Sequence, residues 1–201
     1  MTFPWPRKGD KAFAAASGGK YFHLPWAFLS FVPPHARAFK EAADLLLDTR
    51  ETAEGGHLDA LFFPIAFLYR HSLELKLKEV VHYGLRLDIL RTSKKLDDLL
   101  KGHNLAKLWS KAKAVINERW PGAEQQSPTA VEAVVNEFHH ADSTGQAFRY
   151  DRDTDGKAFR HEKLPKAIDS RRLRKTMDNV WSFLDGCCDG LDDSLRNMGE
   201  Y

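Results

Sequence analysis

The sequence has little cysteine and no long hydrophobic run. Its two cysteines, Cys187 and Cys188, are neighbours, so they cannot link distant segments by disulfide bonds, and they lack the spacing of metal ligands. This usage is typical of proteins kept in a reducing cytosol. No apolar stretch approaches the roughly 20 residues of a membrane-spanning helix, and the N-terminal residues contain no uninterrupted hydrophobic segment typical of signal peptides. We therefore expect a cytoplasmic protein that does not bind membranes.

The sequence also lacks a strong excess of charge of one sign. It has 30 lysines and arginines against 28 aspartates and glutamates, a formal net charge of +2. This balance gives only a weak bias toward anionic partners and differs from the strongly basic composition of dedicated nucleic-acid binders. With 201 residues, of which 43% are hydrophobic, the chain is long enough for one well-formed core and too short for two full domains.

No segment shows a convincing alternation of polar and apolar residues, the pattern typical of β-strands. Helical periodicity, in contrast, recurs along the chain. We predict an all-α fold, an up-and-down bundle of four to five main helices. They are expected from Pro34 to a loop near Thr49, from about Asp59 to Tyr83, from Asn104, from Ser127, and from about Asp169 to Cys188, with a short helix near 96–100. Asn104, and Ser127 followed by Pro128, are the expected helix starts. A short extended pair around Asp155 and Gly156 is the only strand candidate.

Residues 1–33 are rich in aromatic side chains, namely Phe3, Trp5, Phe13, Tyr21, Phe22, Trp26, Phe28 and Phe31. Prolines at positions 4, 6, 25 and 33 discourage regular helix through much of this segment. We therefore divide the chain into a partly irregular aromatic arm, 1–33, and a helical bundle, 34–201. Because aromatic rings are costly to leave in water, the arm is expected to cover either the core of its own chain or a second subunit or other partner.

The expected central helix carries charged residues among residues that otherwise form a core. Arg70, Glu74 and Lys78 follow at intervals of four, so they share one stripe of the helix, with His71 beside them. One interpretation is a structural ion-pair network in which a carboxylate holds Arg70, while Lys76 and Lys78 reach solvent. The carboxylate candidates are Glu74, Asp142 and Asp151. The other interpretation is an anion-binding site, since a guanidinium fits phosphate or carboxylate with two parallel hydrogen bonds.

A polar segment, FRYDRDTDG (148–156), could supply partners for that stripe through Arg149 and its acidic residues. Counted from Asp151, its acidic residues alternate and Glu162 falls at position 12, as in a calcium-binding EF-hand loop. Positive charges enter the ligand set and convincing flanking helices are lacking, so we expect no calcium site. His139 and His140 also lack a metal-ligand spacing. No metal or other cofactor is therefore expected.

Two further groups of residues could bind anions. His103 precedes the helix expected from Asn104, where an imidazole could cap the helix or meet an anion at the positive end of its dipole. Residues 160–175 carry seven positive charges against two negative ones. The candidate anion- or nucleic-acid-binding residues there are Arg160, Lys163, Arg171, Arg172, Arg174 and Lys175. A solvated helix face explains such a run, but arginines at a helix start oppose the dipole, which favours an anionic partner such as phosphate.

In this order on an expected all-helical chain, the segments YRHSLELKLKEV, GHNLAKLW and FRYDRDTDG resemble HEPN-type proteins, a superfamily of helical bundles. The resemblance spans about Phe39 to Leu191. It implies a bundle of four or five helices that often dimerises, is common in bacterial toxin and antiviral systems, and in its active members cuts RNA without a metal ion. Those members use an arginine followed by a histidine after four to six residues. Here only Arg50 and His57 have that spacing, and they fall in a loop away from the family's motif.

Two functions remain open. The one we favour is a non-catalytic or degenerate HEPN-like module that binds RNA, a nucleotide or a partner protein in a bacterial defence or toxin-type system. It would bind through Arg70, Arg149 and the basic residues 160–175. The alternative is a metal-independent ribonuclease, in which a histidine serves as acid or base and an arginine stabilises charge on the phosphorus. Its candidate catalytic residues are Arg70, His71, His103 and Arg149. We expect a homodimer in either case.

Overall fold

The structure, a computed structural model, describes residue 12 and residues 35–52, 56–159, 161 and 164–199, without the side chains of 51, 52 and 56–58. The chain divides into two units, Met1–Pro33 and Pro34–Tyr201, and every helix of the described part lies in the second. The predicted aromatic arm and the candidate residues Arg160 and Lys163 lie outside the described residues.

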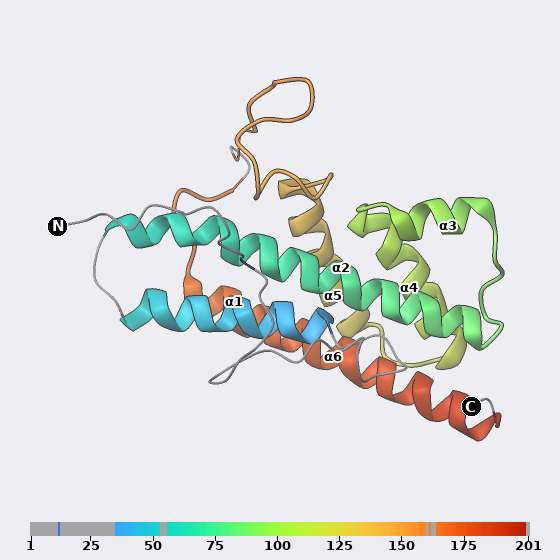
Figure 1. The fold of residues 1–201 in the computed structure, drawn as a ribbon. Helices are drawn as coiled ribbons and strands as arrows, with labels where there is room; N and C mark the ends of the chain where they lie inside the picture. Colours follow the sequence, from blue (N-terminus) through green and yellow to red (C-terminus); the bar gives the residue numbers. More distant parts are fainter. Residues whose placement is uncertain (1–11, 13–34, 53–55, 160, 162–163, 200–201) are drawn as a thin grey trace. The chain divides into compact units, whose positions relative to one another are not determined.

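The second unit is built of helices (Figure 1). They are α1 (His35–Thr52), the 3-10 helix η2 (Gly56–Leu61), α2 (Phe62–Arg86), α3 (Lys94–Lys101), α4 (Leu105–Arg119), α5 (Gln126–Ala141) and α6 (Ser170–Asn197). The described residues are 72% helical and form no strand beyond one antiparallel bridge, Arg152 to Ala158, around a turn at Gly156. The predicted all-α class is therefore confirmed. No helix in the described part is long and apolar enough to cross a bilayer.

The long helix α2 is central and is buried on several sides. It packs against α1, α4 and α6 (Figure 1). Its residues Ile65, Leu73, Leu77 and Val80 are at most 2% exposed. Because three helices cover α2, its apolar residues have to occupy more than one face, which is the pattern that the sequence shows.

Two predicted helix starts can be compared with the structure. At α4 the prediction is confirmed, since the side chain of Asn104 accepts a hydrogen bond from the amide of Lys107 (2.9 Å). At α5 the predicted Ser127 cap is wrong, because Gln125 is the N-cap residue and Ser127 lies inside the first turn. Pro128 is tolerated as the third residue of α5, since the first amides of a helix need no intrahelical partner.

An ion pair between α2 and α6 holds a buried lysine. Lys76 is 5% exposed, and its Nζ lies 2.7 Å from an Asp185 carboxylate oxygen and 5.3 Å from the centre of the Trp181 ring. Asp185 also pairs with Arg37 of α1 at 2.7 Å. The prediction that Lys76 reaches solvent is therefore wrong. The carboxylate of Asp185, which is distant in the sequence, balances the charge of Lys76 inside the bundle.

Candidate functional site

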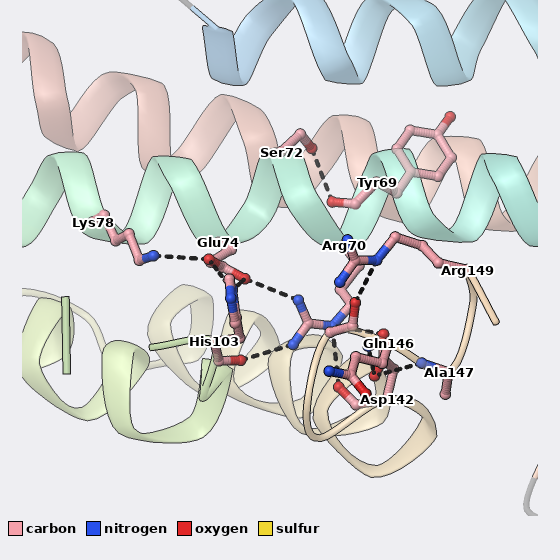
Figure 2. A network of polar contacts seen from close by, with 11 residues as sticks. Tyr69, Arg70, Ser72, Glu74, Lys78, His103, Asp142, Gln146, Ala147 and Arg149 are labelled. Carbon is pink, nitrogen blue, oxygen red and sulfur yellow. Dashed lines mark hydrogen bonds and ion pairs between the residues drawn. The ribbon is translucent and has the colours of Figure 1, made fainter. Parts of the chain in front are cut away.

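Arg70 lies at the centre of a buried polar network that joins α2 to the start of α4 and to the loop after α5 (Figure 2). Its side chain is 2% exposed. Nη1 donates to Glu74 Oε2 (2.9 Å), Nη2 to the backbone oxygen of His103 (2.7 Å), and Nε to the backbone oxygen of Asp142 (3.0 Å). Every nitrogen of the guanidinium thus has an acceptor inside the protein.

Glu74 is the acidic centre of this network. Its Oε1 accepts a hydrogen bond from Lys78 Nζ (2.8 Å) and lies 3.0 Å from His103 Nδ1. Burial by itself raises the pKa of Glu74, but the hydrogen bond and charge of Lys78, with hydrogen bonds from His103 and Arg70, outweigh burial and hold the pKa below the ordinary 4.5. Glu74 is therefore ionised at neutral pH, as the partner of two cations has to be.

Asp142 follows α5 and supplies a second carboxylate, which is 1% exposed. Its Oδ1 accepts hydrogen bonds from the amides of Gln146 (2.9 Å) and Ala147 (3.1 Å). Its Oδ2 lies 3.2 Å from Arg70 Nε, yet accepts no hydrogen bond from the described residues, since that N–H points to the Asp142 backbone oxygen. Asp142 therefore shapes the loop with one oxygen and balances the charge of Arg70 with the other.

Gly145 lets this loop approach Arg70 closely. Its φ of +79° lies in the left-handed region, and a β-carbon at this position would lie 3.2 Å from Arg70 Nη1 and 3.4 Å from His103 Cβ. Any other residue would strain the backbone and crowd the guanidinium. Gly145 was not predicted from the sequence, although the turn-forming residues DSTG that begin at Asp142 were a usable signal.

The buried part of the network has the arrangement of a structural ion-pair cluster. Arg70 and Lys78 face two carboxylates, Glu74 and Asp142, and each carboxylate accepts several hydrogen bonds. Among the three carboxylates predicted as partners of Arg70, these two contact it, whereas Asp151 lies on the surface. This geometry favours the structural interpretation of the charged stripe on α2.

His103 is the member of the network that reaches the surface. Its side chain is 52% exposed, while Nδ1 lies 3.0 Å from Glu74 Oε1. With the proton on Nδ1, the imidazole donates to the carboxylate, and Nε2 is left as a free base. A carboxylate that orients a histidine in this way recurs in hydrolytic sites. The imidazole, unlike the Arg70 guanidinium, is therefore accessible to a ligand.

Arg149 extends from the same loop and is exposed. Its Nε donates to the backbone oxygen of Gly145 (2.8 Å), and its guanidinium carbon lies 5.3 Å from the centre of the Phe67 ring and 5.2 Å from that of Tyr150. Its Nη groups make no hydrogen bond to another described residue. The site therefore holds one buried guanidinium, that of Arg70, and one exposed guanidinium, that of Arg149 (Figure 2).

His71 packs against aromatic rings, one of which, Phe67, also contacts Arg149. Its ring meets Phe39 of α1 edge-on, with ring centres 4.5 Å apart, and stacks on Phe67 at 5.7 Å. Burial lowers the pKa of His71 below the ordinary 6.5, and the charge of Glu74 opposes this only in part. His71 thus packs as a neutral aromatic ring, and it makes no hydrogen bond to a described residue.

Replacing His71 by phenylalanine is expected to make folding stability less dependent on pH. Because the folded-state pKa of His71 lies below 6.5, its contribution is complete above pH 6.5 and is lost as the pH falls toward the folded-state pKa. Phenylalanine keeps the ring contacts and cannot be protonated. Urea denaturation of both proteins from about pH 8 to about pH 5 measures the difference in unfolding free energy. A difference that stays constant over this range would contradict the assignment.

The predicted basic region at the start of α6 is partly engaged by α1. Arg174 pairs with Asp48 and lies 4.0 Å from an oxygen of Asp44. Arg171, Arg172 and Lys175 are exposed. Arg174 therefore contributes to helix packing, while the exposed Arg172 and Lys175 beside it are accessible to an anion.

The other patterns seen in the sequence do not form a site among the described residues. Arg50, which has the arginine-to-histidine spacing with His57, pairs with Asp59 at 2.9 Å, and the side chain of His57 lies outside the described part. Within the described ranges, no group of three or more histidines, cysteines or acids could hold a metal ion. The Arg70 network is therefore the candidate site among the described residues.

A second surface, which was not predicted from the sequence, is formed by the turn after α2 together with helices α3 and α4. We call this open cavity of about 980 Å³ the α3–α4 groove. Its charged lining residues are Arg91, Lys94, Lys95, Lys107, Lys111 and Asp98. The cations were visible in the sequence, but they are distributed over two helices and the turn before them, so only the packing of those helices shows that they share one cavity.

The site can also be compared with known proteins. Family models, curated proteins and solved structures were compared with the chain, and none matched. The resemblance to HEPN-type proteins thus stays a prediction, and the function has to be argued from the Arg70 network and the surfaces around it.

Proposed function

We propose that this protein is a HEPN-like helical module that binds RNA without cutting it, in a bacterial system of the defence or toxin type. The burial of Arg70 carries the proposal. In metal-free RNA cleavage, an arginine has to contact the phosphate on which charge develops. The Arg70 guanidinium is 2% exposed and each of its three nitrogens donates to an acceptor inside the protein, so a phosphate in solvent does not reach it.

The exposed residues next to the network suit RNA. Single-stranded RNA is held largely by stacking of its bases on aromatic rings and arginine planes, together with cations near its phosphates. Arg149 and Tyr150 offer such a guanidinium and ring, and Tyr150 is 57% exposed. Arg172 and Lys175 add exposed positive charge at the start of α6. These residues support RNA over an uncharged ligand.

A metal-independent ribonuclease is the second candidate, and the geometry of His103 favours it. The contact between Glu74 and Nδ1 fixes the imidazole while leaving half of its surface exposed. In this alternative, His103 serves as acid or base and Arg149, not Arg70, stabilises the phosphate. His71 takes no part, because its ring is packed between phenylalanines.

RNA binding is tested with the purified protein, EDTA and a fluorescein-labelled single-stranded RNA of mixed sequence. We expect the wild type to bind the RNA and leave it intact. Tyr150→Ala and Arg149→Ala should each weaken binding about tenfold, because a base stacked on a side chain contributes about 1–3 kcal/mol. Arg86→Ala removes an exposed arginine at the end of α2 and serves as the matched control, with binding equal to that of the wild type.

The same reactions separate the two candidates. Cleavage that the wild type performs in EDTA and that His103→Gln abolishes, with both proteins melting at the same temperature, would establish the ribonuclease. Binding without cleavage supports the module. A folded wild type that neither binds nor cuts the RNA would contradict both candidates.

A further inference from the structure

Local hydrogen bonds hold the three segments that line the α3–α4 groove. The side chain of Ser93 accepts from the amide of Leu96 (3.2 Å) at the start of α3, and Asn104 caps α4. The turn after α2 is closed by a hydrogen bond from the amide of Leu90 to the backbone oxygen of Gly84 (2.9 Å). Figure 1 shows α3 and α4 near the C-terminal end of α2. The groove is therefore formed by segments whose backbone conformation is held by hydrogen bonds.

Positive charge is concentrated in this groove although the whole chain is nearly neutral. Five lining residues are cations and Asp98 is the one acidic residue among the lining residues described. All five cations are exposed, and none is in an ion pair with another described residue. Lys94, Lys95 and Lys107 lie in first helical turns, where positive charge opposes the helix dipole. Helix stability thus does not account for them, whereas an anionic partner does.

The floor of the groove is apolar. Ile89, Leu90 and Leu99 are partly buried against the hydrophobic core, and Leu96 is buried beneath them. The described residues that line the groove include no aromatic ring on which a nucleic-acid base could stack. An aliphatic floor with a cationic rim instead matches a helix that carries leucine-like residues on one face and acidic residues beside them.

We propose that the α3–α4 groove binds an acidic amphipathic helix of a partner protein. Aliphatic side chains of that helix rest on Ile89, Leu90 and Leu99, and its carboxylates meet the lysines of α3 and α4. This interaction is separate from RNA binding, which is assigned to the surface around Arg149, so either proposal can fail without the other.

The test uses a synthetic peptide of about three helical turns, with leucines on one face and glutamates on the other. The peptide is titrated into the nitrogen-15-labelled full-length protein, and binding is followed by NMR up to millimolar peptide. We expect shifts at the amides of residues 89–111. Lys107→Glu combined with Lys111→Glu should weaken binding at least about tenfold. The matched control, Arg172→Glu with Lys175→Glu, makes the same charge change on α6 and should leave peptide binding unchanged.

Three results would overturn the proposal. Absence of shifts at residues 89–111 with millimolar peptide would show that the groove does not take such a helix. Equal binding of a peptide with alanine in place of leucine would show that the apolar floor is not used. Tighter binding of oligouridylate than of the peptide, lost in the Lys107→Glu and Lys111→Glu double variant, would make the groove a nucleic-acid site.

Discussion

Replacement of Arg70 by alanine is expected to lower the free energy of unfolding by about 3–5 kcal/mol, because it breaks a buried ion-pair network from one side. Glu74 would keep Lys78 as a partner, whereas Asp142 Oδ2 would lose Arg70, its one ion-pair partner in the described part of the chain. The backbone oxygens of His103 and Asp142 would also lose their donor. Buried acceptors without donors add to the loss.

Urea denaturation of the wild type and the variant measures this effect. Arg149→Ala is the matched control, since it removes an exposed arginine of the same loop and should change the unfolding free energy by less than about 1 kcal/mol. Arg70→Lys should lower the unfolding free energy by an amount between those of Arg149→Ala and Arg70→Ala, because a single ammonium nitrogen cannot reach the three acceptors that the three guanidinium nitrogens contact. A loss below about 1 kcal/mol for Arg70→Ala would show that the network contributes little to stability.

The structural role of Arg70 determines how functional variants of the site are interpreted. Loss of RNA binding or cleavage in Arg70→Ala would follow from a disturbed loop, since Arg70 holds the backbone at His103 and Asp142. Variants of the exposed His103 and Arg149 leave those two hydrogen bonds in place. They are therefore the substitutions that report on function.

Replacement of Gly84 by alanine is expected to lower the free energy of unfolding by about 1–3 kcal/mol through overpacking. A β-carbon at this position of α2 would lie 2.3 Å from Val115 Cγ2 and 3.3 Å from Leu90 Cδ1. Val115 is fully buried in α4, and a valine in a helix has one strongly preferred rotamer, so it cannot turn aside. The two helices would have to move apart, with loss of contacts along their interface.

A matched control is available in α6. Gly186 also lies in a helix interior, but nothing lies within 4 Å of a β-carbon placed on it. Gly186→Ala should therefore stabilise the protein by roughly 0.5–1 kcal/mol, the usual gain in helix propensity. Chemical denaturation of both variants gives the comparison, and Val115→Ala combined with Gly84→Ala should recover part of the loss. Equal effects of the two glycine substitutions would argue against close α2–α4 contact at Gly84.

The sequence predicted the elements of the bundle better than their ends. Helical periodicity is a local property, so the helices and the Asn104 cap could be recognised from spacing. The start of α5 was misplaced, because serine followed by proline is compatible with more than one position in a first turn. The end of α6 lies beyond the predicted Cys188, since Leu191 and Leu195 continue the buried face.

The sequence by itself determined the all-helical class and the stripe formed by Arg70, Glu74 and Lys78, because residues four apart on one helix are neighbours in any fold. Only the tertiary structure decided that Arg70 is sealed by Asp142 and the His103 backbone, that Lys76 is paired with Asp185, and that His71 packs among aromatic rings. It also gathered the cations of α3 and α4 around one groove. These contacts join residues far apart in the chain, and their geometry depends on how whole helices pack, which local spacing does not specify.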